Sequence, residues 1–286
     1  MKVANVSGRL SLMTAPLEAV DVERASAGRF SSDVQSAYER WDALAEFAAT
    51  VTPGRPDAVR VRPEDLGNPV PSPRQVFAIG LNYADHAAES KFAVPDTPTV
   101  FTKFISCLTG PYGQVTLPAG GDVDWEVELV AVIGRYADQV SEAEAWNHIA
   151  GLTVGQDISE RRLQLSGPAP QFSLGKSFPG FGPVGPVLVS PDEVPDRDDL
   201  ELGTLINGEQ VQQGRTRDLV FPIPALISRL SAVAPLLPGD VIFTGTPAGV
   251  GLGRTPQRYL QDGDELVSYV KGIGEMRHRM VAARGA

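Results

Sequence analysis

The amino-acid sequence predicts a mixed α/β fold that is mostly β, with a small N-terminal domain. The chain has 29 glycines and 24 prolines among 286 residues, which favours turns and short strands over a helix bundle. From Gln75 onward, short apolar runs alternate with turn residues. Residues 52–74 carry six prolines, a content typical of a connector. We therefore expect a small domain with its connector over residues 1–70 and a larger domain over residues 71–286.

The N-terminal residues predict one hairpin and one helix. Residues 2–13 should form a hairpin with its turn near Gly8. Residues 31–51 should form a helix, because apolar side chains recur there every three or four positions. These apolar residues are Val34, Ala37, Trp41, Leu44 and Ala48, and the candidate capping residues are Ser31, Ser32 and Asp33.

The larger domain predicts many strands and few helices. Strands are expected over residues 75–80, 99–104, 123–135, 152–158, 183–189 and 264–281, and a hairpin over 200–212 with its turn at Asn207 and Gly208. Helices are expected over residues 82–90, 141–151 and 221–234, the second of them capped by Ser141 and ended by Gly151. Residues 238–251 should form a turn, a strand and a glycine-rich loop.

Composition excludes several classes of function. The net charge of −10 argues against nucleic acid or an anionic membrane surface as a partner, because both need clustered Lys and Arg. The single cysteine cannot form an internal disulfide, and three histidines with one cysteine do not suffice for a structural Cys/His zinc site. No apolar run reaches the roughly 20 residues of a membrane helix, and no signal-peptide core is present at the start. A cytoplasmic protein is expected.

Two glutamates interrupt the apolar strand predicted over residues 123–135. Glu126 and Glu128 are two positions apart, so they point to the same face of a strand. They are either ordinary residues on a wet edge or, because close carboxylates repel, ligands of a cation. Asp157 ends another apolar strand and is a candidate third ligand, although it could equally cap a turn. Oxygen ligands indicate a hard ion such as Mg²⁺, with Mn²⁺ or Ca²⁺ as alternatives.

His86 and Glu89 are a candidate base and its orienting group. They are three residues apart in a short predicted helix, so both lie on one face of it. The glutamate can then orient the imidazole and raise its basicity. Without further information, a surface histidine remains the alternative.

Six motifs follow one another over roughly residues 71–280: IGLNYADHAAE, PTVFTKF, DWEVELVAVIGR, GQDISERRLQ, GKSF and LLPGDVIFTGTPAGVG. In content and order they resemble the fumarylacetoacetate hydrolase (FAH) superfamily, in particular bacterial members of the acylpyruvase and 2-hydroxyhepta-2,4-diene-1,7-dioate isomerase branch. The resemblance implies a β-roll with flanking helices, and it suggests a homodimer. The first 70 residues resemble the variable leading domain of the bacterial members more loosely.

The resemblance also implies roles for individual residues. Glu126, Glu128 and Asp157 would hold one divalent cation, and His86, Glu89 and Lys176 would be catalytic, with the His–Glu pair on a lid over the substrate. Lys103, Gln164 and Thr246 would contact the substrate, and Gly245 and Gly249 would let the backbone approach it. The chain departs from the common family pattern at Phe104, where proline is usual, and at residues 159–162, which read SERR instead of SARD.

The activity that the resemblance implies is metal-dependent hydrolysis of a C–C bond in an acylpyruvate-like 1,3-diketo acid. The cation would stabilise the enolate left by bond cleavage, and His86 would activate the attacking water. The alternatives are isomerisation of 2-hydroxy-dienedioates and decarboxylation of keto acids on the same scaffold. A catalytically silent binding protein is a third possibility. Each would take a small keto acid as its ligand.

Overall fold

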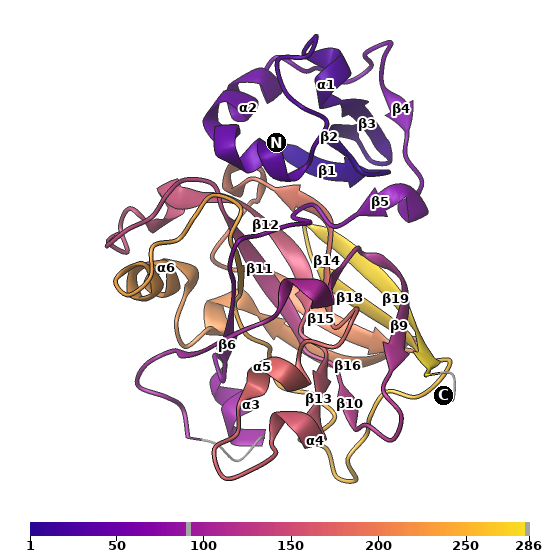
Figure 1. Ribbon diagram of the computed structural model, residues 1–286, viewed down its shortest axis with the longest axis vertical. Coiled ribbons are helices and arrows are strands. Elements are labelled where there is room, and N and C mark those ends of the chain that lie inside the picture. The colour runs from indigo at the N-terminus through magenta and orange to yellow at the C-terminus, as the bar shows by residue number, and fades with distance from the viewer. Residues whose placement is uncertain (90–92, 284–286) are drawn as a thin grey trace.

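The protein is mostly β, and the computed structural model describes residues 1–89 and 93–283 (Figure 1). The expected fold class is therefore confirmed. The largest sheet has twelve strands, ten of them in the order β4-β3-β2-β1-β14-β12-β11-β17-β6-β7, with β5 beside β1 and β8 beside β14. Its strands are β1 (Lys2–Val6), β2 (Arg9–Ala15), β3 (Glu18–Asp21), β4 (Val59–Arg60), β5 (Leu66–Gly67), β6 (Val76–Gly80), β7 (Thr99–Thr102), β8 (Leu108–Thr109), β11 (Val127–Ile133), β12 (Ile149–Gln156), β14 (Gly182–Val189) and β17 (Val241–Phe243).

Two further sheets complete the described β structure. The five-stranded sheet has the order β16-β15-β18-β19-β9, and a small sheet pairs β10 with β13. The strands are β9 (Tyr112–Leu117), β15 (Glu201–Ile206), β16 (Glu209–Arg215), β18 (Glu265–Val270) and β19 (Gly274–Ala282), with β10 (Val123–Asp124) and β13 (Ser159–Glu160) in the small sheet.

The helices are short and flank the sheets. The α-helices are α1 (Val22–Ala25), α2 (Trp41–Ala48), α3 (Ala84–Glu89), α4 (Arg161–Gln164), α5 (Phe172–Gly175) and α6 (Ile223–Ser231). The 3₁₀ turns are η1 (Gln35–Arg40), η2 (Pro63–Asp65), η3 (Ile105–Cys107), η4 (Ala145–His148), η5 (Pro191–Glu193) and η6 (Thr216–Asp218). Helices α3, α4 and α5 gather at the end of the molecule opposite the N-terminal part (Figure 1). Within the described residues, no helix is long and apolar enough to cross a membrane.

The N-terminal part confirms the predicted hairpin and corrects the predicted helix. Strands β1 and β2 pair across a turn in which Ser7 and Gly8 both have positive φ. The helix expected over residues 31–51 is instead split into η1 and α2. Of the predicted capping residues, Asp33 accepts the N–H of Gln35, the first residue of η1, at 3.2 Å. The break lies at Arg40, whose φ of −132° leaves the helical region. It lets Tyr38 and Trp41 stack at 5.4 Å between ring centroids.

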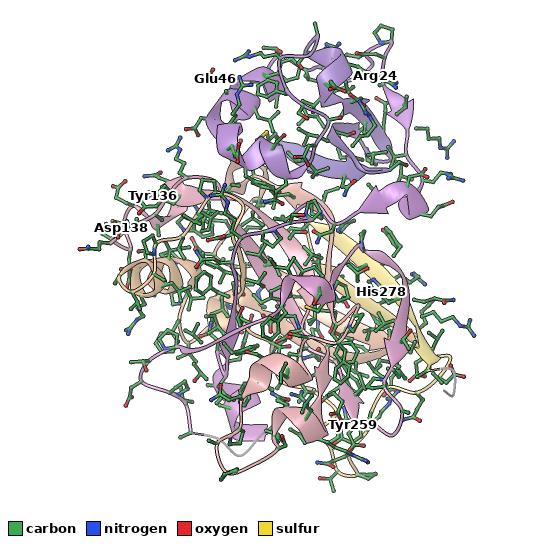
Figure 2. All side chains as sticks on the ribbon, viewed as in Figure 1. Arg24, Glu46, Tyr136, Asp138, Tyr259 and His278 are labelled. Atoms are coloured by element: carbon green, nitrogen blue, oxygen red, sulfur yellow. The ribbon has the colours of Figure 1, made fainter. Side chains whose placement is uncertain are left out.

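The N-terminal part shares both a sheet and a core with the larger part. β1 pairs with β14 in the register Lys2 to Val189 and Val3 to Leu188. Val3, Leu12 and Leu44 are buried in the same cluster as Val132, Leu188 and Phe243. Side chains of both parts meet at this boundary (Figure 2). The proline-rich connector contributes β4, which pairs with β3 at the outer edge of the sheet, then η2, and then β5, which pairs with β1. The domain limits 1–70 and 71–286 stay a prediction.

The strands that carry the acidic residues lie at the centre of the large sheet. β11 and β12 are antiparallel, with Val127 opposite Gln156. The helix predicted over residues 141–151 is wrong, since the segment forms only η4 before β12 begins at Ile149. Gly151 is a strand residue opposite Val132 and not a helix end. A Cβ on it would come within 2.7 Å of Leu188, so close sheet packing explains this glycine.

The remaining predicted elements agree with the structure at their centres. The β15–β16 hairpin turns at Asn207 and Gly208, both with positive φ, as a two-residue hairpin turn requires. Helix α6 buries Ile223, Leu226, Ile227 and Leu230, which repeat with helical spacing. The helix predicted over residues 82–90 is α3, and its last predicted residue, Ser90, lies outside the described residues.

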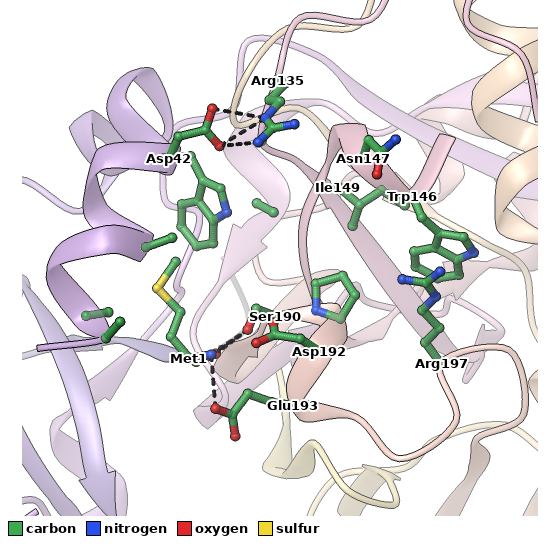
Figure 3. A pocket seen from close by; sticks show the side chains of 17 residues that line it. Met1, Asp42, Arg135, Trp146, Asn147, Ile149, Ser190, Asp192, Glu193 and Arg197 are labelled. Carbon is green, nitrogen blue, oxygen red and sulfur yellow. Dashed lines mark hydrogen bonds and ion pairs between the residues drawn. The ribbon is translucent and has the colours of Figure 1, made fainter. Parts of the chain in front are cut away.

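A cavity of about 480 Å³ lies where the N-terminal part meets the larger part (Figure 3). Asp42 on α2 forms an ion pair of 2.8 Å with Arg135 at its edge, and Arg197 lies 4.4 Å from the ring centroid of Trp146. None of the predicted site residues lines this cavity. It is therefore a feature of the junction and separate from the acidic cluster.

Candidate metal centre and active site

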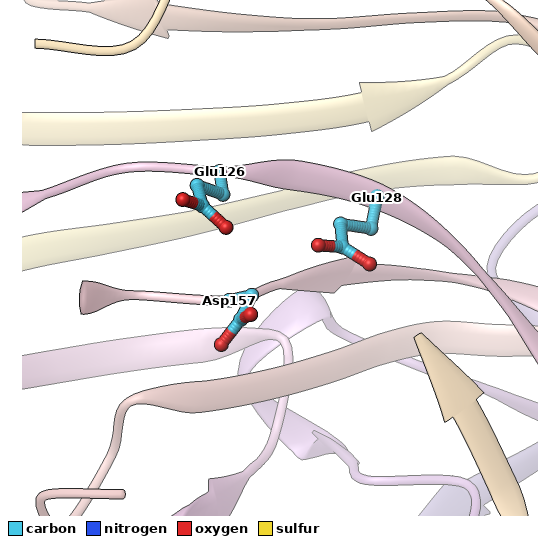
Figure 4. Close-up of side chains that lie close together, drawn as sticks. All are labelled: Glu126, Glu128 and Asp157. Carbon is cyan, nitrogen blue, oxygen red and sulfur yellow. The ribbon is translucent and has the colours of Figure 1, made fainter. Parts of the chain in front are cut away.

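Glu126, Glu128 and Asp157 converge in the interior (Figure 4). Each offers one carboxylate oxygen, and these three oxygens lie within 4.8 Å of one another. Glu128 is in β11, Glu126 lies just before it, and Asp157 directly follows β12. The three residues are 5 %, 1 % and 0 % exposed, which excludes the wet-edge alternative for the glutamates. The pairing of β11 with β12 is what brings Asp157 to the glutamates.

The strand predicted over residues 123–135 is interrupted at the site. It forms β10 and β11, with Trp125 and Glu126 between them. Side chains replace the missing ladder, because the Glu126 N–H donates to Gln156 Oε1 at 2.9 Å and the Val127 N–H donates to Gln212 Oε1 at 3.1 Å. The backbone N–H groups of Glu126 and Val127 therefore both have a hydrogen-bond partner despite the interruption.

Three buried cations surround the triad. Lys176 Nζ lies 2.6 Å from both Glu126 Oε2 and Asp157 Oδ2, and Lys103 Nζ lies 2.6 Å from Asp157 Oδ1. Arg161 Nη1 lies 2.8 Å from Glu126 Oε1. Lys103 also donates to the Lys176 carbonyl, which ties the two lysines together. These contacts bring Lys176 and Lys103 to the acids, as the sequence led us to expect, although their catalytic and binding roles stay predictions.

The two glutamates of the triad titrate in opposite directions. Burial alone would raise both pKa values. For Glu126, the charges of Lys176 and Arg161 outweigh burial and lower the pKa to about 2. For Glu128, burial acts together with the negative charges of Asp157 and Glu126, and the pKa is raised well above its usual value. Glu128 is thus the acid whose charge has least compensation from protein groups.

The donor set fits a hard divalent cation. All three acids supply oxygen, the ligand atom that Mg²⁺, Mn²⁺ and Ca²⁺ prefer. Among hydrogen bonds of the described residues, Glu128 accepts one, from the Gly245 N–H at 2.6 Å. A cation between the acids would supply the compensation that Glu128 lacks. The residues present therefore suit such an ion.

His86 and Glu89 form a hydrogen-bonded pair on α3. His86 Nδ1 lies 2.8 Å from Glu89 Oε1. The Glu89 carboxylate also accepts the backbone N–H of Gly249, at 2.9 Å to Oε2. Because the Glu89 carboxylate acts as a hydrogen-bond acceptor, it favours the His86 tautomer that carries its proton on Nδ1. Nε2 of His86 is then free to take a proton.

Gln164 and Thr246 line the same cavity as His86. Gln164 Oε1 accepts from Arg161 Nη1 at 2.8 Å. The Thr246 hydroxyl donates to the Val127 carbonyl at 2.8 Å, so it links the glycine-rich loop to β11. Their predicted substrate contacts stay predictions. Gly245 and Gly249 have positive φ, and their N–H groups meet the carboxylates of Glu128 and Glu89.

The sequence analysis missed Arg161 and Asp124. Arg161 is 5 % exposed, and its Nε donates to Asp124 Oδ2 at 2.8 Å while Nη1 reaches Glu126. Asp124 also accepts the N–H groups of Gly251 and Leu252. The available signal was the spacing of Arg161 and Gln164, which puts them on one face of a helical turn.

The cavity over this site is narrow. Its free volume is about 30 Å³, against about 480 Å³ for the cavity at the junction. Glu126, Arg161 and Lys176 contribute to its charged part, and His86 contributes from α3. One acid of the triad, Glu126, and the base candidate therefore border the same cavity.

The sequence of residues 75–281 matches the model of the fumarylacetoacetate (FAA) hydrolase C-terminal family. The chain belongs to this family. The fumarylacetoacetate hydrolase assignment accounts for the order of the motifs and for the largely β architecture. Its members include hydrolases, isomerases and tautomerases, so an enzyme is the supported class.

Relatives of the fumarylacetoacetate hydrolase family cover different reactions. The human mitochondrial oxaloacetate tautomerase FAHD2A is 42% identical over 214 residues, which is 74% of this chain and 68% of that one. A candidate HpcE protein from Mycobacterium smegmatis has a TM-score of 0.93 and 54% identity, over 99% of this chain and 100% of that one. A maleylpyruvate hydrolase from Sphingobium sp. SYK-6, in complex with manganese(II) and pyruvate, has a TM-score of 0.82 and 29% identity, over 99% and 100%.

Proposed function

We propose that the protein is a divalent-metal-dependent hydrolase that cleaves a C–C bond in an acylpyruvate-like 1,3-diketo acid. The observation that carries the proposal is that His86 and Glu126 line one cavity, His86 being hydrogen-bonded to Glu89 and Glu126 being one of the three acids of the Glu126–Glu128–Asp157 triad. The His86–Glu89 pair can move a proton and the triad can hold a cation. The maleylpyruvate hydrolase that holds manganese(II) and pyruvate supports a divalent cation and a 2-oxo acid as the ligands of such a site.

Glu126, Glu128 and Asp157 would hold the cation in this proposal. When bound, a divalent ion acts as a Lewis acid on the oxygens of a 2-oxo acid and stabilises the negative charge that develops there. Lys176 and Arg161 keep Glu126 ionised, as its lowered pKa indicates, so it is ready to act as a ligand. Lys103 places a positive charge next to Asp157 through their 2.6 Å contact.

The remaining residues manage the proton and the water. His86 Nε2 takes a proton from water, and the resulting hydroxide adds to the carbonyl carbon of the acyl group. The C–C bond next to the 2-oxo acid breaks, and its electron pair goes to the pyruvate part as an enolate. His86 then returns its proton to the enolate carbon that was bonded to the acyl group, which gives pyruvate. The acyl part leaves as a carboxylic acid. Glu89 holds the ring throughout, because it accepts the Nδ1 proton in a hydrogen bond.

The proposal is tested by the ultraviolet absorbance of the enol of acetylpyruvate and fumarylpyruvate. With Mg²⁺ present we expect loss of the band and appearance of pyruvate, and with EDTA we expect neither. Loss of the band that continues in EDTA would exclude the metal dependence. No pyruvate from either compound would exclude the hydrolase.

Glu128→Gln and Glu64→Gln are a matched pair of variants for this assay. The first removes the charge from a buried ligand candidate, and the second removes it from a side chain that is 62 % exposed on η2. We expect Glu128→Gln to lower kcat/KM by at least about a hundredfold and to weaken Mn²⁺ binding measured by calorimetry. Glu64→Gln should match the wild-type protein in both measurements. Unchanged Mn²⁺ affinity in Glu128→Gln would contradict the triad assignment.

Isomerisation is the second candidate function. It is favoured by the 42% identity to an oxaloacetate tautomerase. In that case His86 would move a proton between two carbons or between carbon and oxygen, and no water would add. Loss of an enol band without pyruvate, with proton NMR showing a keto isomer as product, would select this reaction. A keto-acid decarboxylase would instead release carbon dioxide from oxaloacetate.

We also propose Mg²⁺ as the resident ion, with Mn²⁺ or Ca²⁺ as substitutes, and a homodimer as the assembly. The all-oxygen donor set supports the first. Metal content after purification without added metal tests the ion. Sedimentation velocity tests the dimer, and a single species of about 30.5 kDa would exclude it.

A further inference from the structure

The cavity over the acidic triad has a charged floor and an apolar wall. The floor groups are buried, with Lys176 at 2 % and Arg161 at 5 % exposure. The wall consists of Ile79, Leu81, Phe101, Leu165, Phe172 and Leu252. Leu165 is 37 % exposed and Phe172 is half-buried, so the wall continues to the mouth of the cavity. A ligand that extends outward from the triad therefore passes along apolar side chains.

Two aromatic rings of this wall, Phe101 and Phe172, lie one after the other between Lys176 and the surface. Phe101 on β7 lies 5.1 Å from Lys176 Nζ, measured to the ring centroid. Phe172 on α5 packs edge-to-face against Phe101 at 5.6 Å between centroids. The order Lys176, Phe101, Phe172 leads from the cation next to the triad toward the surface. Phe172 would therefore lie beside a part of the substrate that is farther from the metal-binding end than the part beside Phe101.

The cations that line the cavity are already paired. Lys176 contacts Glu126 and Asp157 at 2.6 Å, and Arg161 contacts Asp124 and Glu126 at 2.7 and 2.8 Å. Among the described residues that line the cavity, no other lysine or arginine is present. Among these described lining residues, a second carboxylate at the far end of a substrate would meet phenyl and leucine side chains and no unpaired lysine or arginine. Burying an unpaired charge in such surroundings is strongly unfavourable.

We propose that the substrate carries a single carboxylate, at its 2-oxo acid end, and an uncharged apolar group at its acyl end. This rests on the proposed function, because it assigns the 2-oxo acid end to the triad. It separates this chain from the relatives named for the diacids maleylpyruvate and 2-hydroxyhepta-2,4-diene-1,7-dioate. Phe101 and Phe172 are the residues that would determine this preference.

Two acylpyruvates that differ only at the far end test the proposal. Crotonylpyruvate ends in a methyl group where fumarylpyruvate ends in a carboxylate. We expect kcat/KM to be at least about tenfold higher for crotonylpyruvate, since a buried site rejects a group whose charge it cannot pair. Equal values, or a higher value for fumarylpyruvate, would overturn the proposal and leave the hydrolase function intact.

A binding measurement separates this inference from the proposed reaction. The Mn²⁺-loaded protein is titrated by calorimetry with 2-oxohexanoate and with 2-oxoadipate, which has the same length and a second carboxylate. We expect Kd to be at least about tenfold lower for 2-oxohexanoate. That result without cleavage of any acylpyruvate would reject the hydrolase and keep the apolar subsite. Equal affinity, tighter binding of 2-oxoadipate, or no binding of 2-oxohexanoate would reject the subsite.

Phe172→Arg and Phe172→Leu test whether Phe172 determines the preference for a substrate with a single carboxylate. The arginine variant offers a counter-ion where the wall is apolar, and we expect it to shift the preference toward fumarylpyruvate and 2-oxoadipate by at least about tenfold. The leucine variant keeps the wall apolar and should keep the wild-type preference. The same preference in all three proteins would show that Phe172 does not determine it.

Discussion

Arg161 and Arg162 are neighbours in the chain and lie in opposite surroundings. The Arg161 side chain is 5 % exposed and bridges Asp124 and Glu126, whereas the Arg162 side chain is 66 % exposed and pairs with Asp122 at the surface. Burial disfavours the charged form of Arg161, but the two carboxylates outweigh it and raise its pKa. The guanidinium therefore stays charged and ties β10 to the metal centre candidate.

Arg161→Met and Arg162→Met should consequently differ in stability. Removal of Arg161 leaves the buried Asp124 without a cationic partner and Glu126 with Lys176 alone, and we expect the free energy of unfolding to fall by about 3 kcal/mol. Removal of Arg162 breaks an exposed pair and should change it by less than about 1 kcal/mol. Urea unfolding followed by circular dichroism measures both. Equal losses would contradict the structural role of Arg161.

At this scale, the sequence predicted the acids better than their counter-ions. Glu126 and Glu128 are recognisable because a strand places positions i and i+2 on one face, and Asp157 because it ends an apolar run. The spacing of Arg161 and Gln164 is the one local signal for Arg161, and it does not say which face of the turn points inward. That direction is fixed when β10 pairs with β13 just before α4. Burial of the whole cluster also depends on strands distant in the sequence.

At the scale of elements, hairpins were predictable and helix boundaries were not. The Asn207–Gly208 turn carries its own conformational requirement, positive φ at both positions, and so marks the hairpin locally. Residues 141–151 look helical by composition, yet Ile149 starts a strand because it pairs with Ile133 in β11. The contact that decides this segment comes from another part of the chain, and so local periodicity misses it.

Strand β19 contains a buried histidine that makes stability depend on pH. His278 is 1 % exposed and its Nε2 lies 3.0 Å from the Gly110 carbonyl, which it meets as a donor (its position is labelled in Figure 2). Burial lowers its pKa to about 4, below the ordinary value of 6.5. Between these values the unfolded chain binds a proton that the folded protein does not bind. The contribution of neutral His278 to the free energy of unfolding is therefore complete above pH 6.5 and is lost as the pH falls toward 4.

His278→Gln should remove this dependence. Wild-type stability is expected to fall by roughly 3 kcal/mol more than that of the variant between pH 6.5 and pH 4. Urea midpoints at half-unit pH steps measure the difference. His148→Gln, a substitution outside the strand, should keep the wild-type slope. Parallel curves for His278→Gln and the wild-type protein would contradict the assignment.

At the scale of the whole molecule, the N-terminal part and the larger part share a sheet and a buried cluster. The strand order places β1 between β2 and β14, so the sheet continues across the boundary. Val3 and Leu44 share a buried cluster with Leu188 and Phe243. The proline-rich composition of residues 52–74 suggested a simple connector, but composition does not reveal that β5 pairs with β1.

A chain that starts at residue 71 tests the predicted domain limits. It would expose one edge of β14 and the buried face that now contacts Val3, and we expect it to aggregate or to unfold without cooperativity. The full-length chain with Val59→Thr, a change at an exposed position of β4, is the control and should unfold as the wild-type protein does. Size-exclusion chromatography and thermal unfolding measure both. A monomeric truncated chain that melts within a few degrees of the full-length protein would show that residues 71–286 fold alone.

The contact between Glu89 and the glycine-rich loop has a consequence for how the protein tolerates substitution. The donors are main-chain N–H groups of Gly249 and Val250, and every amino acid except proline supplies such a group. At position 249 a side chain is nevertheless excluded, since a Cβ would lie 2.2 Å from the Val211 carbonyl oxygen. At position 250 replacement leaves the donor in place. Genetic variation should therefore be nearly absent at position 249. At position 250 it should be limited only by packing and by the exclusion of proline, which has no backbone N–H.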